Sequence, residues 1–98
     1  MSGPIDVNKN GWFMEYGYYH HYVNGVNHRD GGPAIIDHLS KREWWLKNGQ
    51  RHREDGPAVS LFLDDVYVWY YEDQIIGTSN RGYTQKKFEQ WLKFKVFL

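Results

Sequence analysis

The chain has 98 residues, enough for a single domain with one hydrophobic core. Its twelve basic and twelve acidic residues give a formal net charge of zero, which removes the general attraction to a phosphate backbone, so we expect no binding to duplex nucleic acid. The absence of cysteine excludes disulfides and thiolate metal sites, and no apolar run approaches the roughly 18 residues of a membrane span. We therefore expect a cytoplasmic protein without membrane association.

A repeat of 24 residues runs through the chain. Residues 24–34 read NGVNHRDGGPA, residues 48–58 read NGQRHREDGPA, and seven of these eleven aligned positions are identical. A degenerate third copy follows in register, with Trp69 at the position of Trp45. The similarity is lost after Gln74, which is typical of a terminal repeat that ends a stack.

Each clear copy begins with a hairpin signal. Asn-Gly favours a two-residue type I′ turn, because both central residues of that turn need a positive φ. We therefore expect β-hairpins centred on Asn24-Gly25 and Asn48-Gly49. The Gly-Pro step later in each copy starts a new extended segment. The flanking segments are rich in aromatic and β-branched residues, and together they predict six to eight short antiparallel strands over residues 11–82.

The segment 66–71 predicts a strand that is apolar on both faces and needs a cover on each side. The C-terminal segment 84–95 supplies one cover as a helix, for which Thr84 is a candidate N-cap. The apolar stripe of this helix consists of Phe88, Trp91 and Leu92. The predicted fold class is thus mainly β, an antiparallel meander of stacked hairpins with one C-terminal α-helix packed on it.

We treat residues 1–98 as one domain. Residues 1–10 are a candidate for a disordered N-terminus, residues 11–82 form the repeat sheet, and residues 84–95 form the helix. The sequence leaves open whether the last apolar residues, from Phe94 onward, extend the helix, add an edge strand or dock on a partner.

The unit WWLKNGQRHREDGPA resembles the MORN-type repeats, and more closely a variant whose hallmark is H-R-x-D-G-P-A. That variant is familiar from small uncharacterised proteins of bacteriophages and giant viruses. The resemblance covers roughly residues 16 to 95 and implies a single-layer antiparallel sheet of stacked hairpins. Ordinary MORN units have a glycine-rich second half in place of the His-Arg and Gly-Pro-Ala seen here, so the lipid association sometimes attributed to MORN arrays is not expected. The viral resemblance implies a protein that acts in a host cytoplasm.

The repeated pairs His28-Arg29 and His52-Arg53 allow two interpretations. In the first, each pair braces its own turn, with the arginine bonded to backbone carbonyls or carboxylates and the imidazole packed on a ring. In the second, the pairs bind a ligand. No familiar zinc-ligand spacing, nucleophile elbow, phosphate loop or dinucleotide fingerprint occurs, so we expect no metal, no cofactor and no catalytic residue.

Two functions fit these patterns. The first is a non-enzymatic interaction module, plausibly a phage-encoded inhibitor or adaptor, that presents an aromatic sheet face to a host or viral protein. A homodimer through the same patch is an alternative. The second function is sequestration of a nucleotide or another phosphate-bearing small molecule by arginine, histidine and aromatic residues. The candidate binding residues are Trp44, Trp45, Tyr67, Trp69, Tyr71, Arg29, Arg53 and His52.

Overall fold

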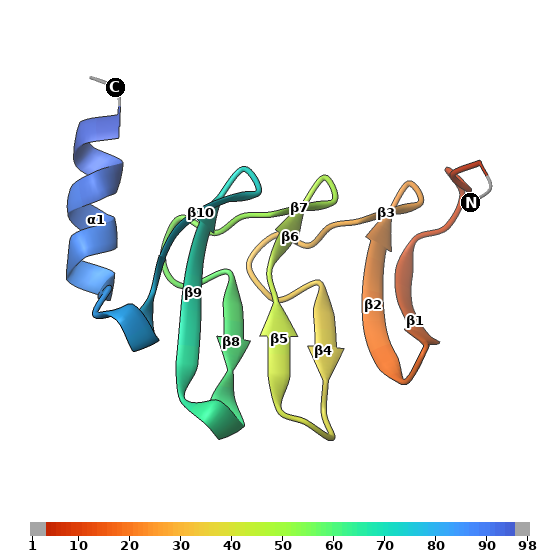
Figure 1. Ribbon diagram of the computed structural model, residues 1–98. Coiled ribbons are helices and arrows are strands. Elements are labelled where there is room, and N and C mark those ends of the chain that lie inside the picture. Colours follow the sequence, from red (N-terminus) through yellow and green to blue (C-terminus); the bar gives the residue numbers. More distant parts are fainter. Residues whose placement is uncertain (1–3, 96–98) are drawn as a thin grey trace.

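The computed structural model describes residues 4–95, which form ten β-strands, two short 3-10 turns and one α-helix (Figure 1). The strands are β1 (Gly11–Glu15), β2 (Tyr18–Val23), β3 (Val26–Asn27), β4 (Ile35–Asp37), β5 (Arg42–Trp44), β6 (Leu46–Lys47), β7 (Gln50–Arg51), β8 (Val59–Leu61), β9 (Val66–Tyr71) and β10 (Gln74–Thr78). The 3-10 turns span Phe62–Asp64 and Ser79–Arg81, and α1 spans Gln85–Phe94. The predicted fold class, a mainly β meander with one C-terminal helix, is confirmed.

All the strand pairs are antiparallel; most join chain neighbours, whereas β2 pairs with β4 and β5 pairs with β8. Within the described residues, eight strands form one sheet in the order β1-β2-β4-β5-β8-β9-β10, with β3 paired to the C-terminal end of β2. Strands β6 and β7 form a separate two-stranded ribbon. The strands outnumber the six to eight expected because three strands of only two residues each, β3, β6 and β7, flank the Asn24-Gly25 and Asn48-Gly49 turns.

The hairpin turns have the conformation that the sequence predicts. Both central residues of three turns have positive φ, as type I′ requires: 50° and 80° at Asn24-Gly25, 52° and 78° at Asn48-Gly49, and 46° and 69° at Glu72-Asp73. Figure 1 shows these turns in a row along one edge of the molecule. The third turn confirms that the degenerate copy is a structural repeat although neither of its turn residues is asparagine or glycine.

Each turn is hydrogen-bonded to the segment that precedes it in the stack. The N–H of the second turn residue donates to a backbone carbonyl in all three cases: Gly25 to Lys9 at 2.9 Å, Gly49 to Asn27 at 2.8 Å and Asp73 to Arg51 at 2.9 Å. The backbone N–H groups at the tip of a hairpin ordinarily donate to water. Here they join one repeat to the next.

The N-terminal segment takes the place of a preceding repeat for the first turn. The backbone N–H of Asn24 donates to Oδ1 of Asn10 at 2.8 Å, and Nζ of Lys9 lies 2.7 Å from the carboxylate of Glu15. These contacts fix the end of the N-terminus that lies nearest the sheet. Residues 1–10 were the candidate for a disordered N-terminus, and residues 1–3 of them lie outside the described residues.

Side chains alternate between the two faces of the sheet. We name one side the loop face, which carries Trp12, His21, Trp45, Trp69 and Tyr71. We name the other side the groove face, which carries Tyr18, His20, Ile35, Trp44 and Leu46. His21, Trp45 and Trp69 are separated by 24 residues, so the repeat places an aromatic ring at the same position of the loop face three times.

The helix α1 covers one end of the loop face. Thr84 is its N-cap, and its hydroxyl accepts a hydrogen bond from the N–H of Lys87 at 3.2 Å, as predicted. Phe88 is fully buried, and the ring of Trp91 lies 5.4 Å from that of Tyr71. The expected packing of the apolar stripe on the sheet is therefore confirmed. No helix in the described part of the chain is both long enough and apolar enough to cross a membrane.

An ion pair at the end of β4 has a buried carboxylate and a half-buried arginine. Asp37 is only 3% exposed, and its carboxylate accepts hydrogen bonds from Nε and Nη2 of Arg42 at 3.1 and 2.7 Å. It also accepts from the backbone N–H groups of Leu39 and Ser40 in the following turn. Arg42 is the main reason why the pKa of Asp37 lies below its usual range, and the bond from Ser40 adds to the effect.

We expect acidification to destabilise the protein partly through Asp37. Because its pKa is lower in the folded than in the unfolded chain, the stabilisation is complete above the unfolded pKa of about 4 and disappears as the pH falls through the folded value. Asp37→Asn should therefore lower the free energy of unfolding at neutral pH and reduce its further loss on acidification. Urea unfolding at a series of pH values measures both effects, and an unchanged acid dependence in the variant would contradict this role.

Candidate binding surface

The second His-Arg-containing loop is built around one arginine. The guanidinium of Arg53 packs against Gly56, where a Cβ atom would lie 2.7 Å from Cζ. From there Nη1 donates to the carbonyl of Pro57 at 3.2 Å and Nε donates to Asp55 at 2.7 Å. The same guanidinium lies 3.7 Å above the ring of Trp45. The Arg, Asp, Gly and Pro of the repeat motif thus form one structural unit.

The first loop repeats this arrangement with its own residues. Nη1 of Arg29 donates to the carbonyl of Pro33 at 3.2 Å, and a Cβ atom on Gly32 would lie 2.6 Å from the guanidinium carbon. The guanidinium lies 5.1 Å from the ring of Trp12 on the loop face. These contacts confirm the interpretation in which each arginine braces its own loop.

The two histidines join each repeat to the next. Nδ1 of His28 accepts a hydrogen bond from the N–H of Asn48, and Nδ1 of His52 accepts one from the N–H of Glu72, both at 2.9 Å. A ring nitrogen that accepts carries no proton, so each neutral imidazole carries its proton on Nε2. The ring of His52 also packs at 4.5 Å on that of Tyr71, as the bracing interpretation expects.

The eight candidate binding residues do not form one site. Seven lie on the loop face or its loops: Arg29, Trp45, His52, Arg53, Tyr67, Trp69 and Tyr71. Trp44 points to the groove face, because it lies opposite Ile35 in the sheet. Trp69 is 5% exposed, and its Nε1 donates to Gln85 of α1 at 2.8 Å. Trp69 therefore belongs to the core, and its assignment as a binding residue is wrong.

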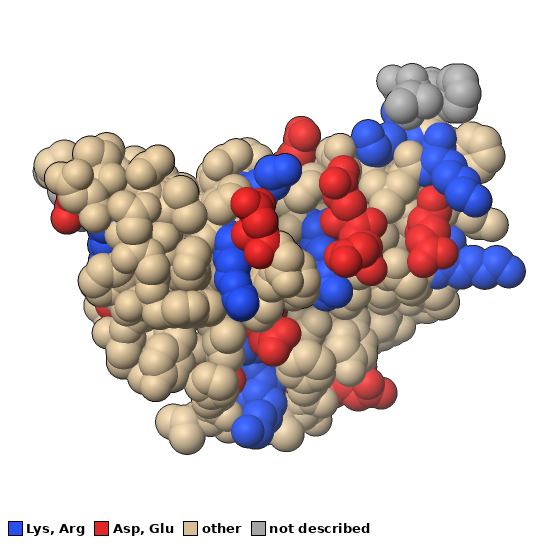
Figure 2. All heavy atoms as spheres, turned by 180° about the vertical axis from the view of Figure 1, so that it is seen from behind, with Lys and Arg blue, Asp and Glu red and all other residues tan. Residues whose placement is uncertain are grey.

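Charge is unevenly distributed over the loop face. Figure 2 shows acidic and basic side chains gathered over the loops and α1, while the area over β1 and β2 at the opposite end is mostly uncharged. Several of these charges belong to the ion pairs that brace the loops, such as Arg53 with Asp55. The charged part of the loop face is thus largely occupied by structural interactions.

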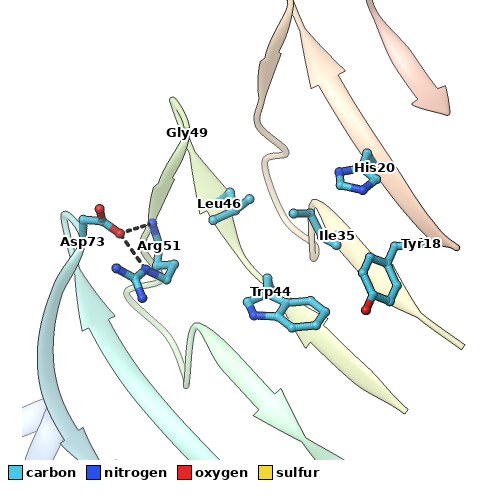
Figure 3. Close-up of a pocket in the computed structure, with 8 residues that line it drawn as sticks. All are labelled: Tyr18, His20, Ile35, Trp44, Leu46, Gly49, Arg51 and Asp73. Atoms are coloured by element: carbon cyan, nitrogen blue, oxygen red, sulfur yellow. Dashed lines mark hydrogen bonds and ion pairs between the residues drawn. The ribbon is translucent and has the colours of Figure 1, made fainter. Parts of the chain in front are cut away.

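The groove face contains a shallow apolar groove of about 400 Å³ that runs across several strands. Figure 3 shows the residues that line it, which come from β2, β4, β5, β6, β7 and the turns after β6 and β9: Tyr18, His20, Ile35, Trp44, Leu46, Gly49, Arg51 and Asp73. The register brings His20 beside Ile35, and Ile35 beside Trp44. Three adjacent strands therefore contribute to its central part.

Two arginines flank the groove. Arg42 lies 5.9 Å from the ring of Tyr18 and 5.5 Å from that of Trp44. At the other side, Nε of Arg51 donates to Asp73 at 2.7 Å, and this bond is the main reason why the pKa of Asp73 lies below its usual range. Both groups of that pair are therefore charged at neutral pH, while the middle of the groove is apolar.

One polar atom in the groove lacks a partner. Among the described residues, Nε2 of His20 is buried and has no hydrogen-bond partner. A buried polar atom without a partner lowers the stability of the fold, and this nitrogen is not exposed to a molecule in the groove. Within residues 4–95, no three His, Asp or Glu side chains lie close enough together to hold a metal ion.

Sequence reasoning identified only Trp44 among the residues of this groove. Strand alternation alone could have placed Tyr18 with His20, and Trp44 with Leu46, on common faces. It could not join these pairs, because their proximity depends on which strands are neighbours in the sheet. The pair of Arg51 and Asp73 likewise links two repeats, and its members are separated by 22 residues.

We expect the two loop arginines to be required for stability. Arg29→Ala combined with Arg53→Ala should lower the free energy of unfolding by more than about 2 kcal/mol, because each variant leaves a proline carbonyl without its charged donor. Lys47→Ala combined with Lys86→Ala, which removes two exposed cations, is the matched control. Thermal and urea unfolding compare the two, and equal stabilities of the double variants would show that the arginines do not brace the loops.

Comparison with known proteins gives no relative for this chain. No family model, no curated protein and no solved structure matches it. The resemblance to MORN-type repeats therefore stays a prediction from the sequence motif. The function has to be argued from the geometry of the two faces.

Proposed function

We propose that this protein is a non-enzymatic binding module that engages another protein through the groove face. A partner inserts one apolar side chain between Trp44, Tyr18 and Leu46, and the surrounding sheet supports the contact. The observation that carries the proposal is the shallow, aromatic-lined groove on the side of the sheet opposite α1 (Figure 3). Central aromatic residues in apolar depressions supply most of the affinity at many protein interfaces.

The rest of the groove suits recognition of an apolar anchor. Its central side chains are apolar, and their removal from water on binding favours association. Arg42 and Arg51 lie at the margins, where polar contacts of an interface usually lie. An apolar centre with a charged margin is the arrangement typical of a protein interface.

The alternative, sequestration of a nucleotide, has less support. Arg29, Arg53 and His52, the residues expected to bind phosphate, lie on the loop side and make structural hydrogen bonds. The groove lies on the opposite face and is open to solvent, whereas small-molecule sites usually bury about 70–90% of their ligand. We therefore propose protein binding, and the experiment below includes release of a bound nucleotide as the result that would favour the alternative.

The test is affinity capture from a cell extract with the wild-type chain and a groove variant, followed by titration of the captured protein. We expect Trp44→Ala to weaken binding of a stoichiometric partner by about 30-fold, the loss typical of a central aromatic residue. Leu63→Ala is the matched control, since Leu63 is an exposed apolar residue that does not line the groove.

A second measurement does not depend on a variant. On titration with the captured partner, the methyl NMR signals of Ile35 and Leu46 should shift, while those of Leu63 should not. A partner that binds both variants equally would contradict the proposal. So would a nucleotide released from the denatured protein in stoichiometric amount without any protein partner.

A further inference from the structure

Strand β1 (Gly11–Glu15) forms one edge of the main sheet, and its outer side is not paired within the described residues. Its partner on the inner side is β2, with Trp12 opposite His21 and Phe13 opposite His20. An unpaired edge presents backbone donors and acceptors that another strand can bind. The direction in which each residue of β1 points therefore decides what can pair there.

Backbone groups of Trp12 and Met14 point outward. The N–H of His21 donates to the carbonyl of Ala34 at 2.7 Å, and its carbonyl accepts from the N–H of His28 at 3.1 Å. Both groups of His21 are thus directed away from β1, so Trp12 and His21 form a non-hydrogen-bonded pair. The groups of Trp12 are then directed away from β2, as are those of Met14 two residues later.

The side chains of this edge are apolar and exposed. Trp12, Phe13 and Met14 are 43%, 38% and 55% exposed, with Phe13 on the groove face and the other two on the loop face. The single charged residue of the strand is Glu15, which is paired with Lys9 at 2.7 Å. Figure 2 shows the mostly uncharged area over β1 and β2 on the loop face.

The opposite edge of the sheet is protected. Strand β10 contains an irregularity between Ile75 and Gly77, and Tyr83 packs on the loop face at Gly77 so closely that a Cβ atom would not fit there. The N–H of Tyr83 also donates to the carbonyl of Thr78 at 3.1 Å. Bulges and covering segments of this kind are how proteins prevent edge pairing. Strand β1, by contrast, has no proline and no lysine.

We propose that β1 pairs with β1 of a second copy of this chain, antiparallel and about a two-fold axis at Phe13. In that register the outward N–H and C=O groups of Trp12 meet those of Met14 in the second copy, and the converse pair forms by symmetry. The strand is self-complementary because its two outward residues lie one position on either side of Phe13. A second copy fits this edge because it presents the same uncharged, exposed row of Trp12, Phe13 and Met14, so apolar side chains meet apolar side chains across the axis.

The same register suits the side chains. The two Phe13 residues face each other as a non-hydrogen-bonded pair, the arrangement in which opposed side chains lie closest. Trp12 of each copy lies beside Met14 of the other on the loop face. Glu15 lies opposite Gly11, and the ammonium of Lys9, 4.9 Å from the ring of Phe13, is neutralised by its ion pair with Glu15 of the same copy. The pairing does not use the groove, so it is independent of the proposed function.

The oligomeric state in solution tests this inference. Light scattering and sedimentation equilibrium should give twice the chain mass of 11.8 kDa for the wild type. Met14→Lys, which puts a charge at the edge but leaves the pairing with β2, should raise the dissociation constant of the dimer at least about tenfold. Ile75→Lys on the other edge strand is the matched control, since Ile75 is also 55% exposed, and it should dimerise like the wild type.

Cross-linking tests the register. The chain has no cysteine, so Phe13→Cys introduces a single thiol per copy. Opposed residues of a non-hydrogen-bonded pair have Cα atoms about 4.5 Å apart, within the range that a disulfide spans. With oxidised glutathione as the oxidant, Phe13→Cys should give a covalent dimer, and Ile75→Cys should stay mostly monomeric.

Three results would overturn the inference. A wild-type chain that stays monomeric at the highest soluble concentration would do so, as would a dimer that Met14→Lys leaves intact. Equal cross-linking of Phe13→Cys and Ile75→Cys would exclude the two-fold axis at Phe13. Circular dichroism of each variant confirms that the fold is retained before these results are compared.

Discussion

The rest of the structure depends on the way in which the backbone amides at the hairpin tips are satisfied. A type I′ turn directs its central N–H groups outward, and in an isolated hairpin water would take them. In this chain the preceding repeat supplies the acceptors: a backbone carbonyl for the second turn residue and, in two turns, an imidazole Nδ1 for the first. Because each hairpin completes the next, the repeats form a continuous sheet from short strands that would not be stable alone.

This constraint explains the division of labour between the two faces. The His-Arg loops must return from each turn to the next strand, and their arginines lie over Trp12 and Trp45 as they do so. The third repeat has no such loop, and α1 covers Trp69 in its place. The side chains that stabilise the stack are therefore concentrated on the loop face. The opposite face is left with an open groove, and β1, the first strand of the stack, is left with an unpaired edge.

Much of the fold could be predicted from the sequence because its signals are local. The Asn-Gly steps and the N-cap Thr84 each depend on a few neighbouring residues, and the 24-residue spacing can be read by comparing the chain with itself. The groove could not be predicted, since His20, Ile35 and Trp44 meet only through pairing between repeats. The burial of Trp69 could not be predicted either, because composition does not say which face of the sheet α1 covers. For the motif arginines the sequence left two interpretations open, and the bracing interpretation could be formulated because the carbonyls and carboxylate that they bond lie within four residues.

Amide hydrogen exchange, measured residue by residue by NMR, tests most directly whether stacked turns hold the repeats together. The turn at Tyr16-Gly17 is an internal control. Its φ values, 54° and 84°, are similarly positive, but it lies between β1 and β2, at the opposite end of β2 from the Asn24-Gly25 turn. The account predicts that the amides of Gly25, Gly49 and Asp73 exchange much more slowly than that of Gly17, although all four lie at hairpin tips. Equal, rapid exchange at all four amides would contradict it.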